Sequence, residues 1–418
     1  MFERVAAPLS SSPPSRSAAL NLGGLQNYGL DPALLPDALA IRDWLLAEAA
    51  RAVDLGRVLS GFAGCLNALG VPVDRMTTAI DALHSEYSGI GRFWTLEEGA
   101  TYQLFPHGPE SDRLYAESPF AHVHRTREWL LLNLSQTPDD RFGVIPDLKA
   151  AGYRYYLVVP IFFTHGSHNG ITFATRAPGG FTERGLKLLR FVMPTLAFVL
   201  EVRSVNLRLE NVLRIYVGDE PHRAILSGTI RRGQVSRIRS AIFFADMRDY
   251  TRLSATLAPE AAVEVLNEFF DCLVPPIEAE GGEVLKYMGD GLLAIFREPE
   301  DDGRAAQSAL AAAVEALARI EAANSEGRFQ TAVAAGIALH HGEAAYGNVG
   351  SGARLDFTEI GPDVNLASRI AQLNRTLGEP LLMSKPFVNY LIGKSESLRA
   401  YSVDGIEEAV PVYRPCRT

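Results

Sequence analysis

Two aspartates in the second half of the chain stand where carboxylates could share a divalent cation. Asp246 follows the apolar run Ala241 to Ala245, which predicts a buried strand that ends at the aspartate. Asp290 lies in a Gly-Asp turn between two further strand-like runs, a hairpin that we expect beside the first strand. Mg²⁺ in proteins binds one or two carboxylates together with phosphate oxygens, so the pair predicts a metal site. Taken singly, each aspartate is more typical of a turn.

A lysine, Lys286, precedes Asp290 by four residues. Because side chains alternate along a strand, these two side chains are expected on the same face. The ammonium group of Lys286 could reach a base or a phosphate, although an isolated lysine on a strand is usually just solvated.

A second polar group surrounds Pro362, which suits the first turn of a helix. That helix would place Asn365 and Arg369 on one face, with Thr358 at the end of the preceding strand. An amide can hold a ribose through hydrogen bonds, and a guanidinium can stabilise charge that builds on a reacting phosphate. The same pair of side chains is common on solvated helices, so the pair indicates a functional site only in combination with the two aspartates and Lys286.

The elements that must position these groups follow one another from residue 241. Apolar steps of three and four residues predict helices, and short apolar or alternating runs predict strands. The expected elements are Ala241 to Ala245, Pro259 to Ile277, Glu283 to Met288, Gly291 to Phe296, Arg304 to Ala323 and Ala332 to Leu339. Their order, βαββαβ, predicts a ferredoxin-like α+β domain in which helices back an antiparallel sheet.

Four ordered motifs together resemble class III adenylyl cyclases, over about residues 235 to 415. The motifs are residues 243–251, 281–291, 347–350 and 358–369. The resemblance implies a head-to-tail homodimer with composite active sites at the interface, each holding two Mg²⁺ or Mn²⁺ ions. Thr358 stands where many members have Asp, as in a bacterial subgroup of these enzymes.

The resemblance also implies a role for each polar residue. Asp246 and Asp290 match the metal ligands, and Lys286 and Thr358 match the pair that recognises the base. Asn365 matches the residue that contacts the ribose, and Arg369 matches the residue that stabilises the transition state. Arg354 matches a position that often contacts the triphosphate. The sequence departs from the family at Asp249 and Tyr250, where Gly-Phe is common, and His340 with His341 matches a structural position.

Donor and acceptor chemistry favours adenine as the base. Lys286 can only donate, and the Thr358 hydroxyl can accept, which matches the N1 acceptor and N6 donor of adenine and not guanine. We therefore expect conversion of ATP to 3′,5′-cyclic AMP and pyrophosphate, with the ribose 3′-hydroxyl attacking the α-phosphate. The alternative is a degenerate cyclase that binds nucleotide as a regulatory module. Diguanylyl activity is disfavoured because residues 281–285 lack a GGDEF string.

The front half of the chain predicts a separate α+β domain. Helical spacing marks residues 38–70, and strand-like runs with one helix at 119–133 mark residues 72–181. The runs are Gly91 to Leu96, Thr101 to Phe105, Tyr155 to Phe163 and Gly170 to Thr175. The pattern resembles a GAF-type sensor over residues 36–181, with an unknown small-molecule signal.

Three side chains of this front domain, His122, His124 and Trp129, are candidates for a ligand or haem pocket. Ordinary packing is the simpler interpretation for all three. No Cys or His pattern specifies a chromophore.

Residues 182–216 predict one long helix with apolar residues largely at steps of three and four. We interpret it as a parallel dimeric helix within a signalling segment, residues 182–234, that leads to the catalytic domain at 235–418. A single helix packed on its own domain is the alternative. The segment Gly218 to Ser240 is expected to be a connector, and residues 1–35 a loose tail.

Composition places the chain among ordinary globular proteins, with 47% hydrophobic and 21% charged residues. The formal net charge of −9 argues against broad nucleic-acid binding. The longest apolar run, Tyr155 to Phe163, is far shorter than the roughly 20 residues of a membrane span. Three scattered cysteines form neither a disulfide nor a zinc pattern, which favours a cytoplasmic location.

Overall fold

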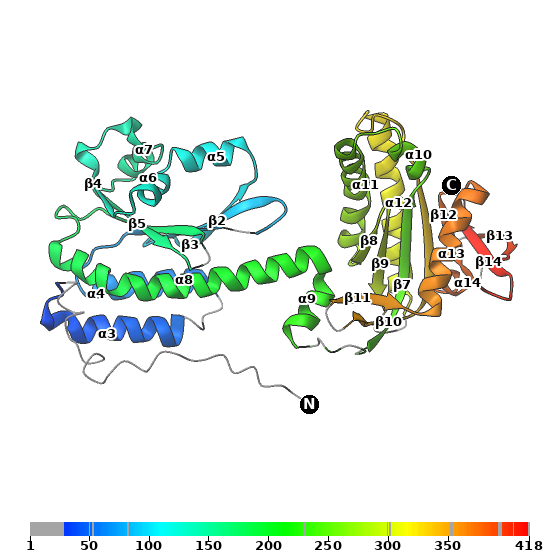
Figure 1. Cartoon of the computed structure of the whole chain (residues 1–418), viewed down its shortest axis with the longest axis horizontal. Coiled ribbons are helices and arrows are strands. Elements are labelled where there is room, and N and C mark those ends of the chain that lie inside the picture. Colours follow the sequence, from blue (N-terminus) through cyan, green and yellow to red (C-terminus); the bar gives the residue numbers. More distant parts are fainter. Residues whose placement is uncertain are drawn as a thin grey trace. The chain divides into compact units, whose positions relative to one another are not determined.

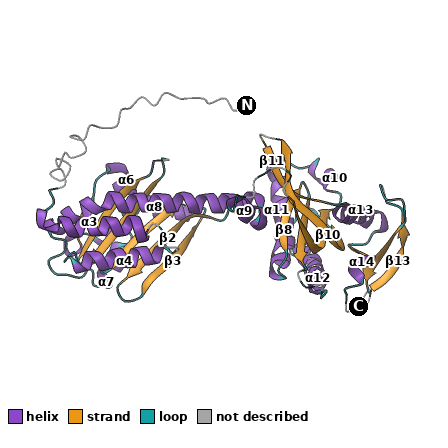
Figure 2. Cartoon of the chain, turned by 90° about the horizontal axis from the view of Figure 1, so that it is seen from below, coloured by secondary structure: helices purple, strands orange, loops and turns teal. Residues whose placement is uncertain are grey.

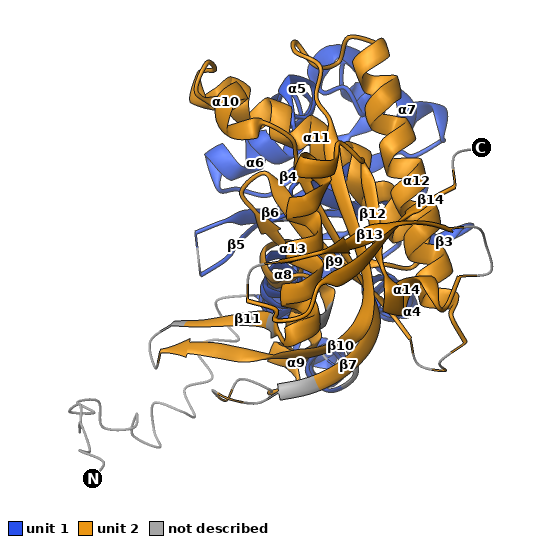
Figure 3. Cartoon of the chain, turned by 90° about the vertical axis from the view of Figure 1, so that its right-hand side faces the viewer, with its two compact units in different colours: residues 1–212 blue, residues 213–418 orange. Residues whose placement is uncertain are grey.

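The chain divides into two compact units, Met1–Val212 and Leu213–Thr418, which are coloured separately in Figure 3. The computed structural model describes residues 29–49, 51, 54–81, 83–164, 166–228, 231, 233, 235–298, 300, 302–351, 354–391, 395–403 and 405–416. Most of the expected tail, residues 1–28, lies outside the described residues. The boundary between the units falls within the expected long helix.

The N-terminal unit is built on a six-stranded antiparallel sheet in the order β3-β2-β1-β6-β5-β4 (Figure 1). Its strands are β1 (Arg75–Asp81), β2 (Tyr87–Thr95), β3 (Gly99–Pro106), β4 (Leu130–Asn133), β5 (Tyr155–Phe162) and β6 (His168–Thr175). The four predicted strands are confirmed as β2, β3, β5 and β6. The sequence did not reveal β1, whose alternate positions carry arginine and threonine, or the four-residue β4.

The predicted helix at 119–133 is wrong beyond Thr126. Helix α6 (Pro119–Thr126) ends where Arg127 adopts a left-handed conformation with φ of 61°. The following residues form β4, which pairs with β5. Backbone pairing with a buried strand has overridden the local helical preference.

Helices cover both faces of this sheet. Helices α3 (Leu35–Trp44), α4 (Leu55–Ala68) and the first half of α8 (Glu183–Val217) gather on one face (Figure 2). The other face carries α6 and α7 (Ile145–Ala150), with α5 (Pro109–Ala116) preceding them in the chain. Short turns complete the unit: η1 (Pro32–Leu34), η2 (Leu45–Ala49), η3 (Leu134–Gln136) and η4 (Asp139–Arg141).

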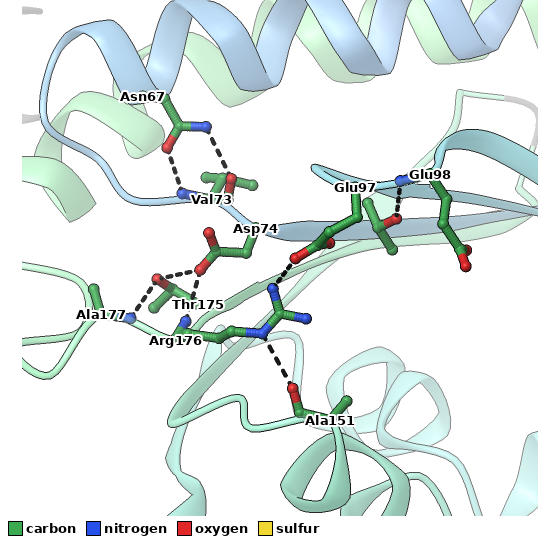
Figure 4. Close-up of polar contacts among 10 residues, drawn as sticks. Asn67, Val73, Asp74, Glu97, Glu98, Ala151, Thr175, Arg176 and Ala177 are labelled. Carbon is green, nitrogen blue, oxygen red and sulfur yellow. Dashed lines mark hydrogen bonds and ion pairs between the residues drawn. The ribbon is translucent and has the colours of Figure 1, made fainter.

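Polar side chains fasten the end of α4 to the start of the inner strand β1 (Figure 4). The Asn67 amide donates to the carbonyl of Val73 and accepts from its N–H, both at 2.8 Å. The next residue, Asp74, accepts hydrogen bonds from the Thr175 hydroxyl at 3.0 Å and the Arg176 N–H at 2.7 Å. These bonds satisfy backbone groups where the chain passes from helix to strand.

Helix α8 is continuous through Pro194, and its two halves differ in burial. Up to Leu200 most of its apolar residues are buried in the core of the N-terminal unit, although Phe198 is exposed. Beyond that point further large apolar side chains are exposed, and together with Phe198 they are Phe198, Val202, Val205, Leu209 and Tyr216. We call these five residues the α8 stripe. Packing on its own domain therefore describes only the first half of the helix.

The C-terminal unit contains a sheet in the order β13-β14-β12-β10-β7-β9-β8, with β11 paired to β10. Its strands are β7 (Val235–Met247), β8 (Glu283–Met288), β9 (Gly291–Arg297), β10 (Ala335–Ser351), β11 (Arg354–Ile360), β12 (Leu381–Ser384), β13 (Ser395–Tyr401) and β14 (Val410–Pro415). The helices are α9 (Asp219–Leu226), α10 (Tyr250–Ser254), α11 (Pro259–Ala279), α12 (Arg304–Ser325), α13 (Pro362–Leu377) and α14 (Lys385–Val388). The expected βαββαβ order is present as β7, α11, β8, β9, α12 and β10.

Two expectations for this unit need correction. The segment Gly218 to Ser240 is not only a connector, because it contains α9 and the first residues of β7. Strand β10 continues past its expected end at Leu339 to Ser351, and its last residues pair with β11 (Figure 3). No helix among the described residues is long and apolar enough to cross a membrane.

Helices α11 and α12 cover one face of the C-terminal sheet, and α13 covers the other (Figure 1). The alternation of β7 explains this arrangement, since Phe243 packs toward α11 and α12 while Ile242 packs toward α13. Phe269 of α11 is fully buried in the first of these cores.

Replacing Phe269 by Ala should destabilise the C-terminal unit by about 3 to 5 kcal/mol, because it removes a fully buried ring. All three tryptophans, Trp44, Trp94 and Trp129, lie in the N-terminal unit. In circular dichroism, we expect the thermal transition of the C-terminal unit to move to a lower temperature. The midpoint of the transition seen by tryptophan fluorescence, which reports the N-terminal unit, should not change. Val263→Ala, at a position on the same helix that is 54% exposed, is the control. Equal shifts in both signals would contradict this division.

Candidate active site

Asp246 lies in the middle of the C-terminal sheet, near the end of β7. Its backbone is paired with Gly291 of β9 on one side and with Gly336 of β10 on the other. Asp290 sits in the turn between β8 and β9, and its carbonyl accepts a hydrogen bond from Met247 N–H at 3.0 Å. The predicted arrangement, a hairpin beside the first strand with both aspartates at strand ends, is confirmed.

The two carboxylates influence each other electrostatically. Burial, and next the negative charge of Asp290, raise the pKa of Asp246 from 3.8 to about 6. Arg248 and Arg375 act in the opposite direction and do not cancel the effect. A cation between the two aspartates would remove the repulsion that raises this pKa.

The surroundings of Asp246 fit a metal site shared with phosphate oxygens. A Cβ atom at Gly291 would lie 2.7 Å from the Ala245 carbonyl oxygen and 3.2 Å from Asp246 Cβ, so only glycine fits there. No group of three or more His, Cys, Asp or Glu side chains suited to a metal occurs among the described residues. A pair of carboxylates suits Mg²⁺, which completes its shell with water and substrate oxygens.

The loop after Asp246 explains one departure from the family pattern. Asp249 adopts a left-handed conformation with φ of 57°, which glycine enters without strain and which Asp tolerates better than most residues. Its carboxylate is 3.6 Å from the Arg375 guanidinium. The backbone shape that a glycine would give is therefore kept with aspartate in its place.

Lys286 lies on β8, just after a bulge in the pairing with β9. Its ammonium group forms an ion pair with Asp356 of β11 at 2.7 Å. Both residues line a cavity of 1050 Å³ within the C-terminal unit, which α9 and the end of α8 also border. Thr358 is two residues beyond Asp356, so the two side chains share a face of β11 near Lys286.

Asp356 contacts a predicted site residue, and the sequence did not predict this contact. Its carboxylate accepts a hydrogen bond from the ammonium group of Lys286 and so fixes the position of that group. The signal was present, because Asp356 and Thr358 have the same parity on one strand. Strand β11 pairs with the end of β10, and this pairing brings Asp356 to Lys286 on β8. The local sequence pattern does not predict this long-range pairing.

Asn365 and Arg369 lie one turn apart on α13, as predicted, with Asn365 exposed and Arg369 half-buried. Arg369 Nη1 is 3.4 Å from Gln372 Oε1, a contact within its own helix. Both side chains therefore remain directed away from the core of the unit. Arg354 begins β11, and its side chain is outside the described part of the structure.

A buried histidine fastens the start of α13 to β10. His340 Nε2 lies 3.3 Å from Asp363 Oδ1, and Nδ1 is 2.7 Å from the Ser384 hydroxyl. The hydrogen bond from His340 lowers the pKa of Asp363. A Cβ at Gly342 would come within 2.3 Å of the Asp363 carboxylate. The structural interpretation of His340 agrees with this network, which fixes the helix that carries Asn365 and Arg369.

The structure thus forms two groups from the predicted site residues. One group is the carboxylate pair, and the other combines Lys286 with β11. No hydrogen bond or ion pair between described residues joins these groups to each other or to Arg369. Within one chain the predicted site residues therefore lie in separate groups on different elements.

Residues 235–391 match the family model described as the adenylate and guanylate cyclase catalytic domain. The match lies within the C-terminal unit and includes every predicted site residue. This unit therefore contains a class III nucleotide cyclase catalytic domain, and the resemblance drawn from the four motifs is confirmed.

Named relatives of this domain are adenylate cyclases. Adenylate cyclase of Anabaena cylindrica is 34% identical over 195 residues, which are 44% of this chain and 38% of that protein. Adenylate cyclase 1 of Rhizobium meliloti is 32% identical over 187 residues, which are 40% of this chain and 28% of that protein. The chain thus spans well under half the length of these relatives.

Solved cyclases are also similar to this chain. Adenylyl cyclase CyaB from P. aeruginosa has a TM-score of 0.40 and 24% identity, covering 44% of this chain and 97% of that one. A bacterial light-regulated adenylyl cyclase has a TM-score of 0.45 and 20% identity, covering 62% and 85%. Both TM-scores are below 0.5, so the assignment rests on the family model and the sequence relatives.

Replacing Asp246 by Asn should stabilise the metal-free protein at neutral pH. The raised pKa means that the folded state binds this proton more tightly than the unfolded state. The destabilisation of the folded state by the Asp246 carboxylate is absent below pH 3.8, grows between pH 3.8 and about pH 6, and is constant at higher pH. The gain in melting temperature should therefore be larger at about pH 7.5 than at about pH 4.5.

Thermal unfolding with and without Mg²⁺ measures this effect. The natural protein should gain more from added Mg²⁺ at neutral pH than the Asp246→Asn variant does. Asp271→Asn, which removes an exposed carboxylate from α11, is the matched control. It should change neither the melting temperature without metal nor the gain in melting temperature on adding Mg²⁺. A variant less stable than the natural protein at neutral pH without metal would contradict the described repulsion.

Proposed function

We propose that this chain is an adenylate cyclase that converts ATP to 3′,5′-cyclic AMP and pyrophosphate. The observation that carries the proposal is the carboxylate pair in a domain that matches the cyclase family, where burial, and next the charge of Asp290, raise the pKa of Asp246. Such a site gains most from cations that arrive with a triphosphate.

Asp246 and Asp290 would hold the two divalent cations and the triphosphate they accompany. When bound, these ions would lower the pKa of the ribose 3′-hydroxyl and neutralise phosphate charge. The 3′-oxygen would form the new bond to the α-phosphorus, the bond to the β-phosphate oxygen would break, and the hydroxyl proton would leave to solvent. The two cations are part of the proposal.

The remaining residues would bind and orient the nucleotide. Lys286, held by Asp356, would donate to adenine N1, and the Thr358 hydroxyl would accept from the N6 amine. Asn365 would hold the ribose, so that the 3′-hydroxyl points at the α-phosphorus. Arg369 would donate to the phosphate oxygens as their charge grows, and Arg354 would contact the triphosphate.

Two copies of the chain would complete each site, because the carboxylate pair and the base-recognition group do not contact each other within one chain. The α8 stripe supports this proposal. Its residues, Phe198, Val202, Val205, Leu209 and Tyr216, follow a seven-residue repeat and are exposed. Such a repeat is typical of a parallel two-stranded coiled coil, in which each stripe covers the other.

The N-terminal unit would act as a sensor of the GAF type that regulates the catalytic domain. Its support is architectural: a six-stranded antiparallel sheet has helices on both faces and a cavity on one of them. We also propose that the protein works in the cytoplasm.

The test is to incubate the purified chain with Mg²⁺ or Mn²⁺ and either ATP or GTP, and to identify the cyclic product by mass spectrometry. We expect cyclic AMP from ATP and far less cyclic GMP from GTP. Lys286→Ala should lower kcat/KM for ATP by about 10- to 100-fold and weaken the preference for ATP. Arg369→Ala should lower kcat by about 100- to 1,000-fold.

A matched lysine outside the site controls for these losses. Lys385→Ala removes a charge whose ammonium group lies over the Tyr413 ring, and it should leave kcat/KM unchanged. ATP binding without any product, with either metal, would favour a nucleotide-binding regulatory module. Cyclic GMP as the main product would contradict the assignment of the base to Lys286 and Thr358.

A further inference from the structure

We propose that the N-terminal unit binds a small carboxylic acid with an apolar body in a cavity beside its sheet. The cavity has a volume of 490 Å³, within the range of about 300 to 1,000 Å³ that is usual for small-molecule sites. It is lined by residues of β1, β2 and β6 and of helices α5 and α6. None of the residues assigned to the cyclase site lies in it.

The cavity exists because this face of the sheet carries small residues where strands usually carry large ones. Gly91 and Gly170 lie on its floor. A Cβ at Gly91 would be 2.8 Å from the Phe105 ring, and one at Gly170 would be 2.4 Å from the Phe120 ring. Aromatic rings thus pack directly over glycines and form apolar walls.

One buried polar atom at the cavity, Thr77 Oγ1, has no hydrogen-bond partner among the described residues. Thr77 is 8% exposed and lines the cavity. The side chain of Asn169 lies on the opposite face of the sheet, because its Oδ1 is 3.2 Å from the hydroxyl of Thr78, which alternates with Thr77 along β1. The Thr77 hydroxyl can donate into the cavity, so a ligand there must present an acceptor.

Arg75 supplies the charge that selects an acid. It is two residues before Thr77 on β1, so both side chains are on the same face of the sheet. Its guanidinium is 5.7 Å from the centre of the Phe93 ring, and no carboxylate of the described residues lies within ion-pair distance of it. An arginine with a neighbouring hydroxyl suits a carboxylate, which accepts several hydrogen bonds.

The polar and apolar parts of the cavity lie at different places along the sheet. Arg75 is paired with Ala174 and Ala79 with Gly170, so the Gly170 end of the cavity is about 13 Å from Arg75 along the strand direction. The ligand that fits carries its carboxylate at Arg75 and Thr77 and extends an apolar body toward Gly170 and the Phe120 ring.

His124 also lines the cavity, as the sequence suggested, but its ring is already engaged. Nδ1 is 2.8 Å from the Tyr115 hydroxyl, and Nε2 is 2.8 Å from the Asn169 carbonyl. His124 thus supports Asn169 and does not offer a free nitrogen to a haem iron. His122 packs edge-on against Phe142, and Trp129 packs beside the core on the opposite face.

Direct binding to the full chain tests the proposal with octanoate and 1-octanol, which share an apolar body and differ in the carboxylate. Isothermal titration calorimetry should show octanoate binding at least about tenfold more tightly. Arg75→Gln should remove this difference. Arg92→Gln, which removes a charge that lies over Tyr102 on the neighbouring strand, should keep it.

A further variant tests the position of the ligand. Ala79→Phe, which fills the cavity, should abolish octanoate binding. Tryptophan-monitored unfolding shows whether each variant is folded, because all three tryptophans lie in this unit.

Three results would overturn the proposal: no octanoate binding, equal binding of acid and alcohol, or binding that survives in Ala79→Phe. The binding claim stands apart from catalysis. Only the further step, that the acid changes the output of cyclic AMP, rests on the proposed function.

Discussion

Asp246 and Asp290 repel each other at the ends of adjacent strands, and the C-terminal fold keeps them together at a cost in stability. Asp246 lies on the central strand β7 between two glycine partners, and Arg248 and Arg375 only partly offset the effects of burial and of Asp290 on its carboxylate. Burial, and next the charge of Asp290, raise the pKa of Asp246 to about 6, and this rise records the cost. The buried cores on both faces of the sheet supply the stability that holds the two aspartates together.

The other polar groups are placed by equally specific contacts. His340, buried between Ser384 and Asp363, fastens α13 and so fixes where Asn365 and Arg369 stand. Asp356 holds the Lys286 ammonium from the strand that also bears Thr358. In each case a polar contact outside the proposed reacting groups fixes the element that carries them, which is a common way to preorganise a site.

The sequence predicted the C-terminal unit better than the N-terminal one. Long amphipathic helices and apolar strands made β7, α11, β8, β9 and α12 readable, because both periodicities are strong there. The sequence pattern did not predict strand β1, because Arg75, Thr77 and Ala79 face a cavity and not an apolar core. The ion pair of Lys286 with Asp356 and the anchoring of Asp363 by His340 join residues distant in sequence. No local pattern could show them without the strand pairing.

The central claim is that one catalytic site is assembled from two copies of this chain. Mixing the Asp246→Ala and Arg369→Ala proteins tests it most directly, under conditions in which subunits exchange. Each variant alone should be inactive, and the mixture should regain part of the cyclic AMP production, because one of the two sites in a mixed dimer keeps both groups intact. A mixture that exchanges subunits and stays as inactive as its components would contradict the shared site.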